Sequence, residues 1–132
     1  MKTLAEKIKA VRKLLDRPKA WTQGLLACNK KGDEVEPDDY DACAFCLVGA
    51  IAFVESGFGI NLSDWSSPYA FVEKSETGLL IASVIMSNCP GSFDDADVDS
   101  VLHEFNDRAG MKHAEVLLIL DEAHLHAVAA GI

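Results

Sequence analysis

Apolar residues near the start of the chain recur at the spacing of an α-helix. Leu4, Ile8, Val11 and Leu15 follow one another three or four positions apart, which puts them on one stripe of an amphipathic helix. Pro18 disfavours helical geometry at the residue before it, so the helix should end at about residue 17. The pattern therefore predicts a first helix from about residue 3 to 17.

Later segments also favour helices. Asp38 and Asp39 precede an apolar run and suit a helix start, because carboxylates there meet free N–H groups. Ser67-Pro68 is typical of a helix start, and Ser92 with Asp95 resembles a capping box. The run LLIASVIM fits a buried strand or a buried helix, and we predict a helix. The predicted helices run from Asp38 to about Glu55, Tyr69 to Glu76, Gly78 to Asn88, Ser92 to about Asn106, and about Lys112 to Ala129.

Between the first two helices the pattern changes to short extended segments. Lys31-Gly32-Asp33 is a turn signal between Leu25–Cys28 and Glu34–Glu36, which predicts a small β-hairpin. The 132 residues are enough for one compact core, and we see no internal repeat. The expected fold is mainly α, with four or five helices and a small β-hairpin after the first helix, in a single globular domain over residues 1–132.

The stretch LLILDEAH, from Leu117 to His124, is similar to the metal-binding strand of a nucleotide-driven ATPase. Such a site also needs a glycine-rich phosphate loop ending in Gly-Lys and Ser or Thr. The chain contains no Gly-Lys pair. Val116, Ile119, Leu120, Ala123 and Ala127 instead fall on one helical stripe, so we interpret the stretch as part of a helix and predict no ATP hydrolysis.

The formal net charge is −9, and the charge is unevenly spread. The first 20 residues hold seven of the twelve Lys and Arg and only two acids, whereas the rest of the chain is strongly acidic. An acidic body repels phosphates, so we expect a protein partner and not nucleic acid. The basic first helix could contact an acidic partner, or its charges could form a solvated face. No apolar run is long enough to cross a membrane and the amino terminus lacks a signal sequence, so we expect a cytoplasmic protein.

Cys43 and Cys46 form a C-x-x-C pair inside the predicted second helix. A zinc site would need a second pair or suitably spaced histidines, and a redox pair would sit at a helix start after a strand. We therefore expect reduced thiols that serve packing, no cofactor and no metal, while a redox or catalytic thiol stays open. Asp95, Asp97 and Asp99 alternate like the start of a calcium loop, but the glycine and glutamate that such a loop requires are missing.

Three short stretches, taken in order, resemble a known family. They are Trp21-Thr22-Gln23-Gly24, then Cys46-Leu47-Val48-Gly49-Ala50-Ile51, then Phe105-Asn106-Asp107. In this order they are similar to a family of small bacterial and phage proteins known as domain of unknown function 6197. Members often have tryptophan where this chain has Phe45. They also tend to have cysteine where it has Thr22, and this second difference argues against a paired-cysteine site. The resemblance implies a lineage and a compact fold, and no activity.

The leading functional hypothesis is a small intracellular accessory or interaction protein without catalytic activity, encoded by a phage or mobile element. Candidate binding residues are Trp21, Gln23, Asn106 and Asp107, which could equally form a scaffold of packing and turn contacts. One alternative is a small enzyme or ligand-binding protein in which Cys46 is the nucleophile and His103 the base. Another is an acidic mimic of nucleic acid that inhibits a DNA-binding protein, which would need carboxylates arranged in a stripe.

Overall fold

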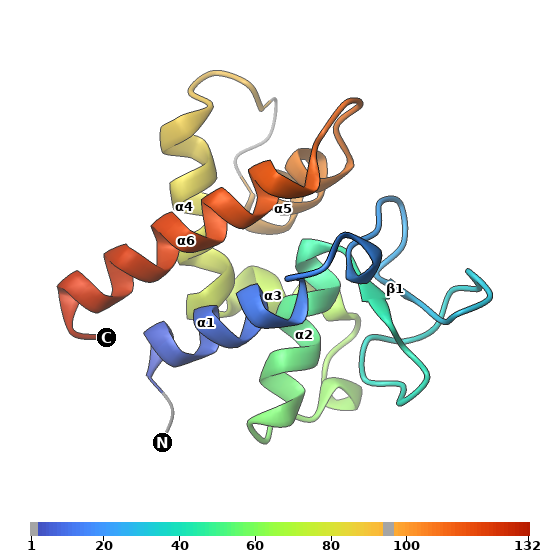
Figure 1. Cartoon of the computed structure of the whole chain (residues 1–132). Helices are drawn as coiled ribbons and strands as arrows, with labels where there is room; N and C mark the ends of the chain where they lie inside the picture. Colours follow the sequence, from blue (N-terminus) through green and yellow to red (C-terminus); the bar gives the residue numbers. More distant parts are fainter. Residues whose placement is uncertain (1–2, 94–96) are drawn as a thin grey trace.

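The computed structural model describes residues 3–93 and 97–132, and in this part of the chain the fold is mainly helical (Figure 1). Six α-helices, one for each of the six predicted ranges, surround one core, although the fold was expected to have four or five; a two-stranded antiparallel sheet follows the first of them. The fold class predicted from the sequence is confirmed. The elements are α1 (Leu4–Leu14), the 3-10 helix η1 (Pro18–Ala20), β1 (Ala27–Cys28), β2 (Ala44–Phe45), α2 (Leu47–Gly57), the 3-10 helix η2 (Leu62–Asp64), α3 (Pro68–Lys74), α4 (Glu76–Asn88), α5 (Val98–Asp107) and α6 (His113–Ala130).

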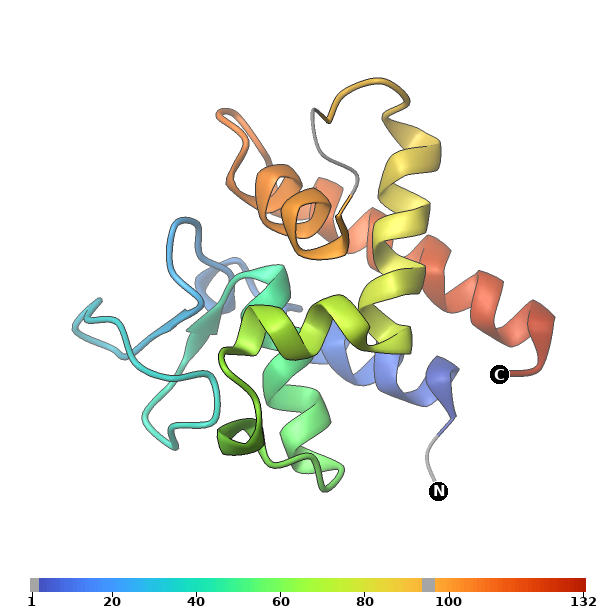
Figure 2. The same ribbon diagram turned by 180° about the vertical axis from the view of Figure 1, so that it is seen from behind.

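Helix α2 is the centre of the molecule. Eight of its eleven residues are buried, and it packs against α1, α3 and α5. Helix α4 packs against α5 and α6, as the view from behind shows (Figure 2). Among the described residues, the only buried charge is Glu55 of α2, whose carboxylate lies 2.8 Å from Lys7 Nζ of α1 and 3.4 Å from Thr77 Oγ1 of α4. Because a buried carboxylate needs such partners, this contact ties three helices together.

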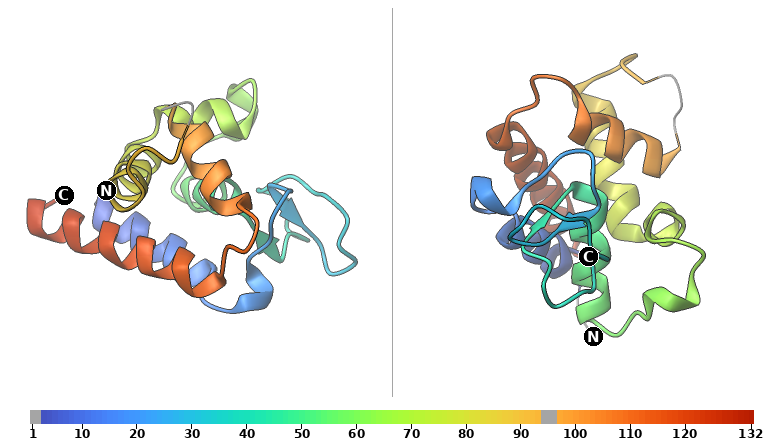
Figure 3. Two further views of the ribbon diagram at one scale, coloured as in Figure 1. Left: turned by 90° about the horizontal axis from the view of Figure 1, so that it is seen from above. Right: turned by 90° about the vertical axis from the view of Figure 1, so that its right-hand side faces the viewer.

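Helices α1 and α6 lie side by side in opposite directions (Figure 3). The Ala5 amide donates to the Ile132 carbonyl at 3.0 Å at one end, and His113 Nε2 lies 2.5 Å from the Leu15 carbonyl at the other. Between them Arg12 Nε donates to Asp121 at 2.9 Å. The two antiparallel helices are therefore joined at both ends, and their packing brings the two ends of the described chain together.

The stretch Leu117–His124 lies within α6, as the helical spacing predicts. Its two acids hold neighbouring helices: Asp121 pairs with Arg12 of α1, and Glu122 accepts a hydrogen bond from Asn88 Nδ2 of α4 at 3.0 Å. The two acids that make the stretch resemble an ATPase strand thus have a structural role, because they bind α6 to α1 and α4.

The predicted bounds of α3, α4 and α6 agree with the structure to within about two residues, and α3 had a local capping signal. Ser67 Oγ accepts a hydrogen bond from the Ala70 amide at 3.1 Å, with Pro68 in the first helical position, as expected for Ser67-Pro68. Ser75 ends α3 and caps α4 by accepting from the Gly78 amide at 3.0 Å. The ambiguous segment 78–88 is helical, and α6 ends at Gly131, which has φ +74°.

The second helix was predicted to begin too early. It begins at Leu47 rather than at Asp38, because residues 44–45 pair as a strand and Cys46 is the helix cap. Asp39 serves a loop instead, where its side chain accepts a hydrogen bond from the Asp41 amide at 2.8 Å. The apolar run through this region therefore spans a strand and a helix.

The small sheet has a different second strand from the one predicted. Strand β1 pairs with β2, with Ala27 opposite Phe45 and Cys28 opposite Ala44. The predicted turn is present, since Gly32 has φ +85° and Asn29 Oδ1 accepts from the amides of Lys31 and Asp33. The segment 34–36 lies along the other edge of β1, where it makes a single bridge, Cys28 to Glu34, and the Val35 amide donates to the Ala27 carbonyl at 3.1 Å.

Helix α5 begins at Val98 with Asp97 at its cap position, later than predicted. The expected capping box pairs Ser92 with Asp95, and residue 95 lies outside the described residues. Within the described chain, no helix is both long enough and apolar enough to cross a membrane.

Candidate functional site

The residues that carry the family resemblance meet at one junction, and Asn106 is its centre. Asn106 is fully buried at the carboxyl end of α5. Its Oδ1 accepts from Trp21 Nε1 at 2.7 Å and from the Leu47 amide at 3.1 Å. Its Nδ2 donates to the Thr22 carbonyl at 3.0 Å and to Asp107 Oδ1 at 2.8 Å. An asparagine side chain has two donor hydrogens and an oxygen that accepts about two bonds, so its polar capacity is used within the protein.

The Leu47 amide is one of the free N–H groups at the start of α2. Asn106 therefore caps a helix that lies 59 positions away in the sequence. The segment after Trp21 completes the junction. Gln23 Nε2 donates to the carbonyls of Asn106 and Arg108 at 2.9 and 3.2 Å, at the end of α5, and Asp107 accepts from the Gly24 amide at 3.0 Å.

Of the predicted binding residues, Trp21, Gln23, Asn106 and Asp107 are thus all brought together. Trp21 is half-buried, and its ring centroid lies 6.1 Å from that of His113. Each of the four makes hydrogen bonds to other parts of the chain, so the arrangement serves as a scaffold that joins the 21–24 segment, α2 and α5.

Gly49 allows the same junction to close. A Cβ built on Gly49 would lie 1.8 Å from the Leu26 carbonyl oxygen, which is far inside contact distance. The Cys46 amide donates to that same carbonyl at 3.2 Å. Gly49 is therefore required because the backbone before β1 runs directly over the first turn of α2.

Cys46 lies at the start of α2, directly after strand β2. A redox thiol is expected at such a position, whereas the sequence predicted Cys46 inside a helix. Its Sγ accepts from the Gly49 amide at 3.4 Å. Burial nevertheless raises the pKa of the Cys46 thiol to about 11, because the thiolate would lose its hydration, and the nearby Asp107 acts in the same direction. Cys46 therefore stays a protonated thiol at neutral pH, whereas Cys43 is exposed.

His103, the candidate base, is used elsewhere. Its Nδ1 lies 2.8 Å from the Asp99 carbonyl of its own helix, and its ring meets Tyr69 edge-on with centroids 6.1 Å apart. Among the residues that the structure describes, no hydrogen bond joins Cys46 and His103.

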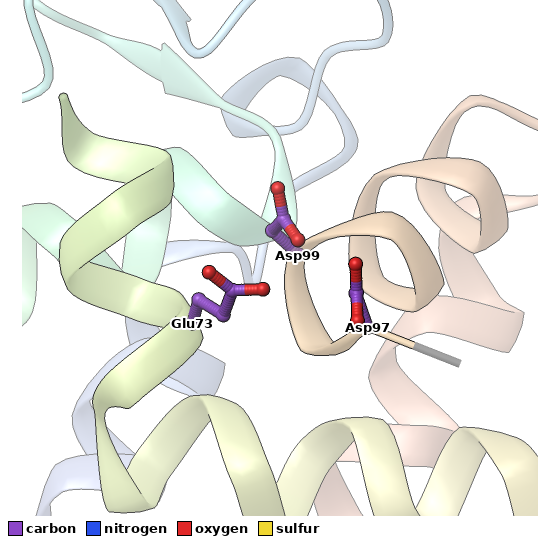
Figure 4. A group of neighbouring side chains, drawn as sticks. All are labelled: Glu73, Asp97 and Asp99. Atoms are coloured by element: carbon purple, nitrogen blue, oxygen red, sulfur yellow. The ribbon is translucent and has the colours of Figure 1, made fainter. Parts of the chain in front are cut away.

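A group of three carboxylates was not foreseen as a whole. Glu73 of α3 lies beside Asp97 and Asp99 at the start of α5, and one oxygen from each falls within 4.8 Å of the others (Figure 4). The neighbouring Asp99 raises the pKa of Glu73 because two negative charges repel each other at this distance. Three carboxylates could ligate a hard cation, but two of them also serve the start of a helix, where acids are favoured.

The loop between β1 and β2 presents a tyrosine to solvent. Tyr40 is 93% exposed, the largest exposed fraction among the large hydrophobic residues described. It lies between Asp39 and Asp41, with Asp38 immediately before them. The turn is held by the Asp39 amide on the Glu36 carbonyl and the Ala42 amide on the Asp39 carbonyl, both at 3.0 Å. A lone aromatic among acids in the sequence DDYD was the available signal, and the prediction of a helix there concealed it.

A family model described as a family of unknown function, DUF6197, matches residues 1–126. This chain belongs to that family. No curated protein and no solved structure matches the chain. The DUF6197 match spans both halves of the Asn106 junction, from Trp21 to Asp107, so the contacts that join the 21–24 segment to α2 and α5 lie within the family's region.

Proposed function

We propose that this chain is a small intracellular accessory protein, of phage or mobile-element origin, that acts by binding a protein partner and has no catalytic activity of its own. The proposal rests mainly on the exposure of Tyr40, whose side chain lies in solvent on an acidic turn. Exposed tyrosines are among the residues that most often dominate the energy of protein interfaces, because they bury a large rigid ring and offer one hydroxyl.

The turn that carries Tyr40 is ordered by the protein itself. The Cys43 amide donates to the Cys28 carbonyl at 2.9 Å, which anchors the end of the loop to β1. Asp39 Oδ1 accepts from the Asp41 amide, so one acid fixes the backbone beside the tyrosine. A loop that is already ordered loses less conformational entropy when it binds, which favours recognition by this segment.

The charges around Tyr40 define the partner's chemistry. Asp38, Asp39 and Asp41 make no ion pair within the described part of the chain. A complementary surface would therefore place Lys or Arg side chains around a pocket for an aromatic ring. The buried, protonated thiol of Cys46, which no hydrogen bond joins to His103 in the described residues, favours this proposal over the enzyme alternative.

Affinity purification from the native host, followed by mass spectrometry, tests the proposal. Wild-type protein should retain a partner that Tyr40→Ala loses, while Leu125→Ala should retain it, since Leu125 is an exposed apolar residue on α6 far along the chain. Replacing Asp38, Asp39 and Asp41 together by Asn removes the charges and keeps the Asp39 oxygen that holds the turn. We expect this triple variant to weaken binding and to abolish most of its salt dependence.

Equal recovery of the partner by wild type and Tyr40→Ala would contradict the proposed surface. A turnover of any small substrate that Cys46→Ser abolishes would contradict the non-catalytic role.

A further inference from the structure

A groove of about 490 Å³ lies between the carboxyl-terminal halves of α1 and α2, and nothing described so far uses it. Its floor includes Leu14 of α1 and Phe53 of α2, both half-buried, and Phe58 at the end of α2 is 39% exposed at its edge. The groove shares no residue with the Tyr40 loop. Its volume is within the range of natural small-molecule sites, which is roughly 300–1,000 Å³.

Two cations line this apolar surface. Lys13 lies in the last turn of α1 and Arg17 in the extended segment that follows it. Both are exposed, and both line the groove. No acidic side chain is among the described residues that line the groove, although the chain has twenty-one acids and only twelve Lys and Arg.

These two cations are also unpaired, in contrast to their neighbours on α1. Lys7 is bound to Glu55, and Arg12 is held by Asp16 and Asp121. No ion pair joins Lys13 or Arg17 to an acid anywhere in the described ranges. Two unpaired cations over an apolar floor complement a molecule with a negative head and an apolar body.

We propose that this groove binds a small carboxylic acid with a medium-length aliphatic body. The carboxylate lies between Lys13 and Arg17, where the guanidinium can form two parallel hydrogen bonds with it. The aliphatic body covers Leu14, Phe53 and Phe58, and removal of this apolar surface from water provides the rest of the affinity.

The acidic character of the whole protein does not prevent this. Exposed charges are screened over about 8 Å at physiological ionic strength, so a bound carboxylate interacts mainly with the groove itself. The groove is also held open in advance, because the ion pair between Lys7 and Glu55 fixes α1 against α2 next to it. A small molecule fits the eight-residue lining, whereas the neighbouring turns of both helices are already packed in the core.

An NMR titration of the isotope-labelled protein with octanoate tests the proposal, with octanol as the neutral probe of the same length. We expect amide shifts to cluster in the second halves of α1 and α2, and octanol to bind about tenfold more weakly than octanoate. Exchanging both Lys13 and Arg17 for Gln should reduce octanoate affinity about tenfold and leave octanol unchanged. Exchanging both Lys30 and Lys31 for Gln, an equal loss of two positive charges in the 29–33 turn, should change neither.

Gly57→Leu gives a steric test that does not depend on charge. A Cβ at Gly57 meets no atom within 4 Å, so the new side chain enters the groove without strain and should block both probes. Amide spectra of the variants outside the groove show that each one is folded. Shifts located elsewhere, equal affinity for octanol and octanoate, or no saturation at millimolar octanoate would each overturn the proposal. Binding of an acidic peptide in the groove without binding of octanoate would overturn it as well.

Discussion

Asn106 uses its polar atoms to join three separate segments, so its loss should be felt as a loss of stability. In Asn106→Ala the Leu47 amide, Trp21 Nε1 and the Thr22 carbonyl lose their partner in a buried setting. Each buried unsatisfied group costs about 1–3 kcal/mol, and we expect a total of about 2–4 kcal/mol because water can reach the half-buried Trp21. Denaturant unfolding of the purified variant measures this.

Trp21→Phe is the matched control, because it keeps the ring and removes one hydrogen bond. It should cost about 0.5–1.5 kcal/mol, and the double variant should cost less than the sum of the two single variants. If Asn106→Ala unfolds at the wild-type denaturant concentration, Asn106 is free for a ligand and the scaffold interpretation is wrong.

The two cysteines of the C-x-x-C pair should differ in reactivity. The pKa of the Cys46 thiol is raised from 9.0 to about 11 by burial, so at pH 8 it has roughly one hundredth of the thiolate that the ordinary pKa would give. We expect iodoacetamide to modify the exposed Cys43 of the native protein well before Cys46. Peptide mass spectrometry over a time course measures both, and faster modification of Cys46 would restore it as a candidate nucleophile.

Glu73 should make stability depend on pH. Its pKa is raised in the folded protein above the ordinary value of 4.5 by the nearby Asp99, so protonation favours the folded state. This stabilisation is fully present below the pKa that Glu73 has in the unfolded chain. It is lost as the pH rises through the higher pKa that Glu73 has in the folded protein. Glu73→Gln removes the repulsion and should raise the unfolding temperature at pH 7 but not at pH 4.

Glu104→Gln, an exposed acid outside the carboxylate group, is the charge-matched control for Glu73→Gln. An equal rise in unfolding temperature for both variants would attribute the effect to net charge and not to the contact between Glu73 and Asp99.

Helix α2 is the element in which a single methyl group should matter most. Gly49→Ala places a Cβ 1.8 Å from the Leu26 carbonyl, so the backbone before β1 must move away. We expect destabilisation of about 3 kcal/mol or more, against the gain of up to about 1 kcal/mol that alanine gives in a helix. Gly57→Ala in the same helix meets no atom and should be neutral or slightly stabilising. The reverse order of the two variants in thermal unfolding would contradict the close packing of α2 on Leu26.

The elements that the sequence predicted well are those with local signals. Helix α1 follows from its apolar stripe and Pro18, and α3 from Ser67-Pro68. The start of α2 could not be predicted, because residues 42–54 form one apolar run and the strand within it depends on pairing with β1, about 17 residues earlier. The same error hid the exposed turn at Tyr40 and placed Cys46 inside a helix.

At the scale of the whole molecule, the sequence showed which motif residues belong together but not how they contact one another. Trp21, Gln23, Asn106 and Asp107 were expected to share a role, and they share a junction. That Asn106 caps α2 follows only from the packing of α5 against it, which no local pattern encodes. Cys46 and His103 were paired because their chemistry matches, yet each is satisfied by its own helix. The carboxylate group of Glu73 arises in the same non-local way.

We propose that this protein binds its partner through the acidic turn at Tyr40, and site-specific photocrosslinking in the native host tests this most directly. A benzophenone amino acid replaces Tyr40 in one strain and the exposed Leu125 of α6 in another. We expect one dominant crosslinked protein from position 40, with a basic surface at the point of attachment. This product should be lost when Asp38, Asp39 and Asp41 are replaced by Asn, and position 125 should give no equivalent product. Absence of a crosslink at position 40 from a protein that is folded and expressed, or the same product from both positions, would contradict it.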